Sequence, residues 1–267
     1  MCLAAFAINA SAKWPLVIAS NRDEFFDRPA LPLSLWQTGA GQTILSGRDA
    51  RAGGTWLGIT PAGRIGLLTN VRELNPPVAP KSRGELVMRW LQGRMDADQF
   101  AKHTDSAAYG GFNLVLGDLP SGQWHCLSNR PHAAGLHNQR MADGVYGLSN
   151  AALDTPWPKT LGLKAAMQQA LQTESEEPLW QALAHRGRRA DNELPQTGLP
   201  LALEAALSSA FVDAPERGYG TRCSTLLVAT AVRQKWHVQI TEKTHVLGSK
   251  GVIANASVQR LDMMLDA

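Results

Sequence analysis

Residues 1–24 read MCLAAFAINASAKWPLVIASNRDE, and this stretch decides the fold that we predict. Two apolar runs, residues 3–8 and 16–20, are separated by a polar segment that contains a proline, residues 9–15. Short apolar runs arranged in this way are typical of two strands joined by a loop. Such a hairpin returns the end of the second strand to the start of the first, so it brings residues 21–24 beside Cys2.

Alternation along the second strand predicts which side chains accompany Cys2. We expect Asn21 and Asp23 on the face of Cys2, and Arg22 and Glu24 on the opposite face. If Met1 is removed, Cys2 carries its thiol and a free α-amine on the same residue, and the amine serves as the base of the thiol. The reference pKa of an α-amine, about 7.7–8.0, suits this task near neutral pH. We therefore predict that Cys2 is the chemical centre of the chain.

The composition indicates a globular protein. We expect the 267 residues to form a single domain over residues 1–267, because a chain of this length buries a large core. With 44% hydrophobic and 18% charged residues, the chain is not disordered. A net charge of +3 is too small to indicate nucleic-acid binding. The densest basic cluster, Arg186, Arg188 and Arg189, has no interleaved aromatic residues, so we interpret it as a solvated loop.

The cysteines indicate a reducing compartment. Cys2, Cys126 and Cys223 give neither an even disulfide framework nor the paired spacing of a metal site. We therefore expect reduced thiols, no metal, and a cytoplasmic location. The apolar residues 3–10 are too short to span a bilayer and lack a basic segment before them, so we expect no signal peptide and no stable membrane insertion.

The order of the remaining elements predicts the fold class. We expect a proline-rich loop over residues 29–36 and a helix that a capping box at Ser82 begins. Thr155 is the predicted N-cap of another helix, with Pro156 at its first position. We predict further strands over 56–59, 64–70, 112–117, 123–128, 145–150, 226–232 and 236–243, and helices over 96–103, 155–171, 179–186 and 201–211. Strands in the middle with helices segregated around them indicate an α+β layered sandwich.

Several motifs carry a family resemblance. They are Met1-Cys2, NRDE at 21–24, AGGTWLG at 52–58, LTNVR at 68–72, GLSN at 147–150, TPWPK at 155–159 and YGTR at 219–222. Together they resemble the NRDE family, which is related to transport and Golgi organisation protein 2. That family is similar in turn to the N-terminal-nucleophile hydrolases, so the resemblance implies their four-layer αββα sandwich.

The resemblance also implies roles for individual residues. Cys2 takes the place of the nucleophile, and Asp23 orients its amine. Asn150 takes the place of an oxyanion donor, and Arg222 favours the thiolate and the developing negative charge. In the hydrolase pattern, an arginine stands directly before the asparagine that corresponds to Asn21. This chain has Ser20 there.

Two classes of function stay open. In the first, the protein is an enzyme in which Cys2 attacks the carbonyl of an amide or a thioester. In the second, it binds or carries haem or an acyl-CoA or other lipid inside the cell, which the resemblance also implies. We favour the second, because Ser20 replaces the basic residue. No cofactor is then required, and haem is a candidate ligand. The residues expected to contact the ligand are Asn21, Arg22, Arg48, Trp56 and Asn70.

Overall fold

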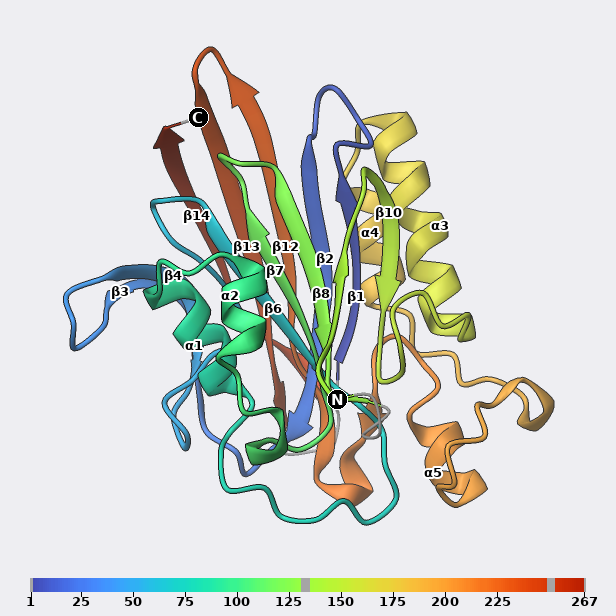
Figure 1. The fold of residues 1–267 in the computed structure, drawn as a ribbon. Helices are drawn as coiled ribbons and strands as arrows, with labels where there is room; N and C mark the ends of the chain where they lie inside the picture. Colours follow the sequence, from blue (N-terminus) through green and yellow to red (C-terminus); the bar gives the residue numbers. More distant parts are fainter. Residues whose placement is uncertain (1, 131–134, 249–252, 267) are drawn as a thin grey trace.

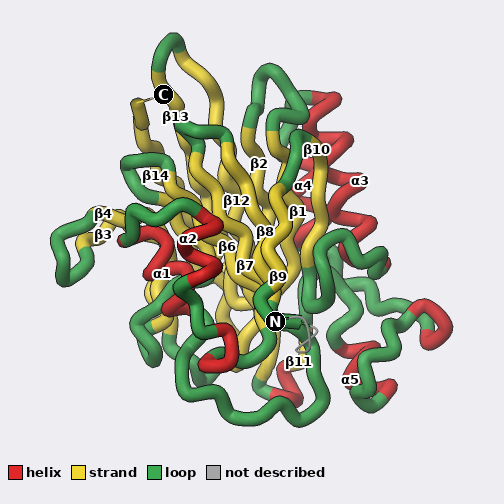
Figure 2. The backbone as a smooth tube through the Cα atoms, viewed as in Figure 1, coloured by secondary structure: helices red, strands yellow, loops and turns green. Residues whose placement is uncertain are grey.

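Two stacked antiparallel sheets form the centre of the molecule, and helices lie over their outer faces (Figure 1, Figure 2). The structure, a computed structural model, describes residues 2–130, 135–248 and 253–266. Each sheet has seven strands. The predicted α+β sandwich is therefore confirmed.

The first sheet contains the predicted N-terminal hairpin. Its order is β10-β1-β2-β12-β13-β14, with β11 paired to β12. The bounds are β1 (Cys2–Ile8), β2 (Leu16–Phe25), β10 (Gly144–Leu148), β11 (Asp213–Ala214), β12 (Tyr219–Val232), β13 (Lys235–Leu247) and β14 (Ile253–Asp266). Strand β14 was not predicted. It is an edge strand that is mostly part-exposed, so its sequence lacks the continuous apolar run that marks β12.

In the second sheet, each strand pairs with its neighbour in the sequence, from β3 to β9. The bounds are β3 (Ala30–Gln37), β4 (Thr43–Asp49), β5 (Leu57–Ile59), β6 (Arg64–Asn70), β7 (Phe112–Asp118), β8 (Gln123–Ser128) and β9 (His137–Arg140). The predicted loop over residues 29–36 is wrong, because most of it belongs to β3. Strand β3 lies at the sheet edge, and its register shifts between Leu31 and Ser34. Edge position and irregular pairing are the conditions under which a strand tolerates a proline such as Pro32.

Helices form the outer layers. Helices α1 (Gly84–Gln92) and α2 (Ala97–Lys102) cover the second sheet, and α3 (Pro158–Thr173) and α4 (Glu177–Leu183) cover the first. Helix α5 (Leu201–Ala206) lies apart from them, at the lower right of Figure 1. Short 3-10 helices occupy Ser106–Ala108, Asp191–Glu193 and Pro215–Arg217. Two predicted helix starts are wrong. The N-cap of α1 is Arg83 rather than Ser82, and the N-cap of α3 is Trp157 rather than Thr155, with Pro158 at the first position.

The main core lies between the sheets. Phe6 and Ile18 of the first sheet pack there against residues of the second, such as Leu67 and Val115. Alternate residues of β1 and β2, such as Leu3, instead face α3 and α4. Cys2 falls in the alternation of Phe6, so it faces the space between the sheets. Within the described ranges, no helix combines the length and the apolar character that crossing a membrane requires.

Candidate functional site

The pairing register decides which side chains accompany Cys2. Cys2 lies directly opposite Arg22, and Leu3 lies opposite Asn21. Residues directly opposite each other in an antiparallel pair point to the same face of the sheet. Arg22 therefore shares the face of Cys2, and our prediction that Asn21 and Asp23 share it is wrong. A shift of the register by one residue exchanges the two faces, and the hairpin loop alone does not fix that register.

A cavity of about 400 Å³ opens where β1 begins. Cys2, Arg22, Asp23, Trp56 and Asn70 are the predicted site residues that line it. The rest of its wall comes from the loop over residues 76–84 and from the ends of β2, β4 and β6. Its volume lies in the range of small-molecule sites, about 300–1,000 Å³.

Four predicted site residues do not line this cavity. The Nδ2 of Asn21 donates to the carbonyls of Leu183 and Ala210, both at 2.8 Å, on the helix-covered face. The guanidinium of Arg48 lies 4.3 Å from the centroid of the Trp36 ring, on the outer face of the second sheet. Asn21 therefore ties β2 to the helical layer, whereas Arg48 of β4 packs on Trp36 of the neighbouring strand β3 in the same sheet.

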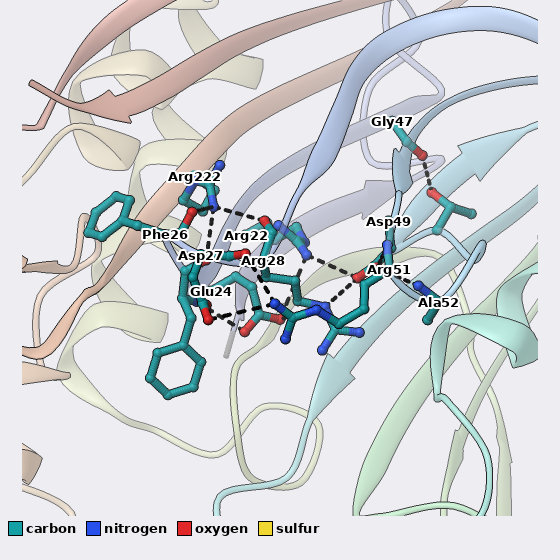
Figure 3. A network of polar contacts seen from close by, with 12 residues as sticks. Arg22, Glu24, Phe26, Asp27, Arg28, Gly47, Asp49, Arg51, Ala52 and Arg222 are labelled. Carbon is teal, nitrogen blue, oxygen red and sulfur yellow. Dashed lines mark hydrogen bonds and ion pairs between the residues drawn. The ribbon is translucent and has the colours of Figure 1, made fainter.

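Asn150 and Arg222 support the site from behind its wall. The Nδ2 of Asn150 donates to the carbonyl of Asn70 at 2.9 Å. Arg222 sits at a bulge of β12, where the register against β2 shifts. Its Nη1 donates to the carbonyls of Phe25, Phe26 and Arg28 at 2.8, 3.2 and 3.1 Å (Figure 3). Arg222 thus fixes the turn that presents Arg28.

Two arginines and two carboxylates form a network at one wall (Figure 3). Asp49 accepts from Arg28 at 2.6 Å and from Arg22 at 3.3 Å. Glu24 lies 3.7 Å from Arg22 and 3.8 Å from Arg28. Burial acts to raise the pKa of Asp49, but hydrogen bonds from the Ala52 amide and from Arg28 hold it below its ordinary value. Both cations on this wall are therefore engaged by carboxylates.

Arg22 still has an unused donor. Its guanidinium lies 4.3 Å from the centroid of the Trp56 ring, and Arg22 is 5% exposed. Its Nη1 is buried and has no hydrogen-bond partner within the described residues. An unsatisfied buried donor is costly, so a ligand acceptor in the cavity would stabilise this arrangement.

The opposite wall carries a cation that our sequence analysis missed. Arg83 lines the cavity, and its Nη1 donates to the carbonyl of Gly111 at 3.1 Å. In the part of the chain that the structure describes, no carboxylate forms an ion pair with it. Burial lowers the pKa of Arg83. The signal was present in the sequence, because Lys81 and Arg83 precede α1, where the positive end of the helix disfavours cations unless an anion is nearby.

The Gly53-Gly54 pair brings α1 to this wall. A Cβ on Gly54 would lie 2.6 Å from the carbonyl carbon of Gly84, the first residue of α1. Only glycine permits such an approach. Gly54 therefore serves helix packing, and through it the placement of Arg83, whereas Gly53 adopts a positive φ of 73°.

Cys2 and Asp23 are both deeply buried. Burial and the nearby Asp23 carboxylate raise the pKa of the Cys2 thiol, and Arg22 opposes this increase. Burial also raises the pKa of Asp23, against the charge of Lys159 and a hydrogen bond from the Thr221 hydroxyl at 2.7 Å. Burial thus favours the protonated thiol. The prediction that Met1 is removed concerns a residue outside those described.

This architecture defines a class of proteins. Two stacked antiparallel sheets between helices form the fold of the N-terminal-nucleophile hydrolases. A crystallised variant of conjugated bile acid hydrolase from Clostridium perfringens matches it with a TM-score of 0.51. That match covers 98% of this chain and 92% of the hydrolase, at 7% sequence identity. At this identity the match shows the fold alone.

The family follows from the sequence. The chain belongs to the Transport and Golgi organisation 2 family, whose model matches residues 1–246. The chain is 33% identical over 250 residues to the Transport and Golgi organization protein 2 homolog of Bos taurus, covering 88% of this chain and 87% of that one. It is 31% identical over 245 residues to the Homo sapiens homolog, covering 86% of each. The family that the motifs indicated is therefore confirmed.

Proposed function

We propose that the protein binds an anionic, amphipathic small molecule, haem or an acyl-CoA-type lipid, in the cavity around Cys2. The observation that carries this proposal is a cavity of about 400 Å³ with Arg83 on its wall and no carboxylate paired to it within the described residues. A carboxylate or phosphate is the natural partner of such a guanidinium, because the two form short, charge-assisted hydrogen bonds.

The first turn of α1 supports the same wall. Ser82, Arg83 and Gly84 all line the cavity where α1 begins. The positive end of the helix dipole attracts negative charge, although the amides of Glu85 and Leu86 already donate to the carbonyls of Ser82 and Arg83. Arg22 lines the same cavity, and its Nη1 is buried with no hydrogen-bond partner among the described residues. The anionic group of the ligand therefore belongs between Arg22 and α1.

The apolar body of the ligand needs a separate surface. Trp56 and Leu68 line the inner part of the cavity, and Pro76, Pro77 and Pro80 line it from the loop before α1. Haem and acyl-CoA both combine an apolar body with negative groups, so the lining suits either. Pairing an apolar strip with a cationic wall is the usual design of a site for such ligands.

The test begins with protein purified without added ligand. An absorption spectrum and mass spectrometry identify what co-purifies, and titrations with haemin and palmitoyl-CoA follow. Arg83→Ala removes one charge-assisted contact worth about 1.5–3 kcal/mol, so we expect binding to weaken about ten- to hundredfold.

The matched control is Arg51→Ala. Arg51 lies on the exposed loop beside Asp27 and does not line the cavity, but its loss lowers the net charge equally. We expect affinity to stay unchanged in this variant. Equal weakening in both variants would refute a specific anion contact at Arg83.

The position of Cys2 favours a second candidate function, hydrolysis of an amide or thioester. Cys2 lines the cavity directly opposite Arg22, whose charge favours the thiolate, although burial holds the pKa of the thiol above its ordinary value. Cys2→Ser preserves the volume of the side chain but removes the nucleophile. A hydrolase would lose thiol release from palmitoyl-CoA while retaining affinity, whereas a lipid carrier would keep its affinity and show no turnover in either form. A haem carrier that ligates through Cys2 would lose affinity and shift its absorption spectrum.

A further inference from the structure

A second cavity, of about 310 Å³, lies on the helix-covered side of the first sheet. Its wall comes from the first turns of α3, from α4, and from residues 185–189 and 208–210. Lys159, His185 and Arg189 line it, and none of the described lining residues is an aspartate or glutamate. It is therefore a basic cavity on the opposite face of the sheet from Cys2.

Lys159 is a built part of this cavity. It lies in the first turn of α3, is 5% exposed, and its Nζ donates to the carbonyl of Leu207 at 3.0 Å. Burial lowers its pKa to about 8, so Lys159 is mainly protonated near neutral pH. Burying an ammonium group is costly, and the nearby carboxylates of Asp23 and Glu204 offset part of that cost.

The arginine cluster of residues 186–189 divides into structural and free members. Arg186 pairs with Asp213 and lies 4.1 Å from the centroid of the Phe211 ring. Arg188 donates to the carbonyl of Asp213 at 3.2 Å. Arg189 is held through its backbone amide, which donates to the Ser208 hydroxyl at 2.9 Å. Arg189 is half-buried and lines both this cavity and a smaller pocket beside Glu193, and its guanidinium forms no hydrogen bond or ion pair with any described residue.

His185 lies over Gly187 at the same wall. A Cβ on Gly187 would lie 2.6 Å from the Cε1 of His185, so only glycine lets the imidazole ring take this position. The ring is exposed and forms no ion pair with a described carboxylate. Arg189 and His185 thus bring two basic side chains to the cavity, and Lys159 forms part of its wall.

We propose that this second cavity is a binding site for the phosphate group of a small phosphate monoester. A phosphate monoester carries about −1.5 to −2 charges at neutral pH and several acceptor oxygens, which suits a cavity with several cationic donors. A volume of about 310 Å³ holds roughly ten water-sized groups, enough for a phosphate and a short polar body. The site is separate from the cavity around Cys2 and does not depend on the function proposed there.

Calorimetric titration of the full chain with glycerol 3-phosphate tests the proposal, with glycerol as the uncharged comparison. We expect saturable binding of glycerol 3-phosphate with a dissociation constant below about 1 mM, and no binding of glycerol. Arg189→Ala should weaken the binding at least tenfold. Arg188→Ala is the matched control. It removes the same charge from the neighbouring residue, whose side chain does not line the cavity, so it should leave affinity unchanged.

A second variant separates binding from folding. Gly162 lies in α3 on the cavity wall, and a Cβ there would meet no atom within 4 Å. Gly162→Met fills the cavity, and replacing a helical glycine stabilises rather than weakens the helix. It should abolish binding while the melting temperature is kept or raised. Arg83→Ala, in the other cavity, should leave glycerol 3-phosphate binding unchanged.

Vesicles identify the source of the phosphate. If the protein sediments with phosphatidic acid vesicles, and Arg189→Ala and Gly162→Met abolish this co-sedimentation, the result would support the site with a lipid headgroup as its ligand. Failure of both glycerol 3-phosphate and the vesicles to bind would overturn the proposal. Equal weakening by Arg188→Ala and Arg189→Ala would also overturn it, because it would mean that the charge acts without a defined site.

Discussion

The ion pair between Arg72 and Glu204 should be a major support of the fold. Arg72 follows β6 and Glu204 lies in α5, and their side chains are 2% and 3% exposed. The Thr197 hydroxyl donates to the other carboxylate oxygen of Glu204. The Arg72 guanidinium also lies 4.7 Å from the centroid of the Trp157 ring. This pair therefore anchors the segment around α5 to the two sheets.

Removing one partner leaves the other charge buried and unpaired. Such a change costs about 3–5 kcal/mol, a large part of the roughly 5–15 kcal/mol that stabilises a typical domain. We expect this loss in urea denaturation of Arg72→Met and of Glu204→Gln, with a melting temperature lower by about 6–20 °C. The double variant Arg72→Met/Glu204→Leu should recover most of the loss, because apolar residues often replace a buried ion pair without net cost.

The exposed pair of Lys13 and Glu174 provides the control. Its nitrogen and oxygen lie 2.6 Å apart, but the two side chains are 48% and 56% exposed. Lys13→Met should change the free energy of unfolding by less than about 1 kcal/mol, because solvent screens exposed pairs. If Glu204→Gln proves as mild as Lys13→Met, then the Arg72–Glu204 pair is solvated and the reasoning fails.

Two further predictions concern Lys159 and Gly54. Because the pKa of Lys159 falls from 10.5 to about 8 on folding, the unfolded chain binds more protons between these values. The stability of the wild type relative to Lys159→Met should therefore rise as pH increases from about 8 to 10.5, and urea denaturation across this range measures it; a flat difference would contradict the burial of the charge. Gly54→Ala should cost about 1–3 kcal/mol and weaken ligand binding, because its Cβ would displace Gly84. Gly39→Ala, where a Cβ meets nothing within 4 Å, should show neither effect in the same assays.

The layer order could be predicted from the sequence, but the faces of the strands near the site could not. The apolar runs of β1 and β2 mark both strands, and the separation of strands from helices indicates the sandwich. Which residue lies opposite Cys2 depends on a one-residue choice of register that the loop over residues 9–15 does not determine. The bulge at Arg222 is equally invisible, because its side chain leaves the alternation of β12 only when the strand pairs with β2.

The hydrolase pattern has an arginine where this chain has Ser20, and this difference alters the site less than the sequence suggested. Ser20 lies opposite Ala4, and Arg22 lies opposite Cys2, so both face the space between the sheets. Arg22 therefore supplies a guanidinium beside the thiol, although Asp49 already engages it.

The unpaired guanidinium is on the other wall, at Arg83. Arg83, which we propose contacts the anion, is the N-cap of α1, and the thiol belongs to β1, so the two groups come from different layers of the sandwich. Arg83→Ala should lower the affinity for the ligand while the Cys2 side chain stays in place, although the variant also removes a positive charge that interacts with the thiolate. Cys2→Ser should change turnover, where turnover exists, without touching the anion contact. If both variants instead changed affinity and turnover together, Arg83 and Cys2 would contact the same group of the ligand.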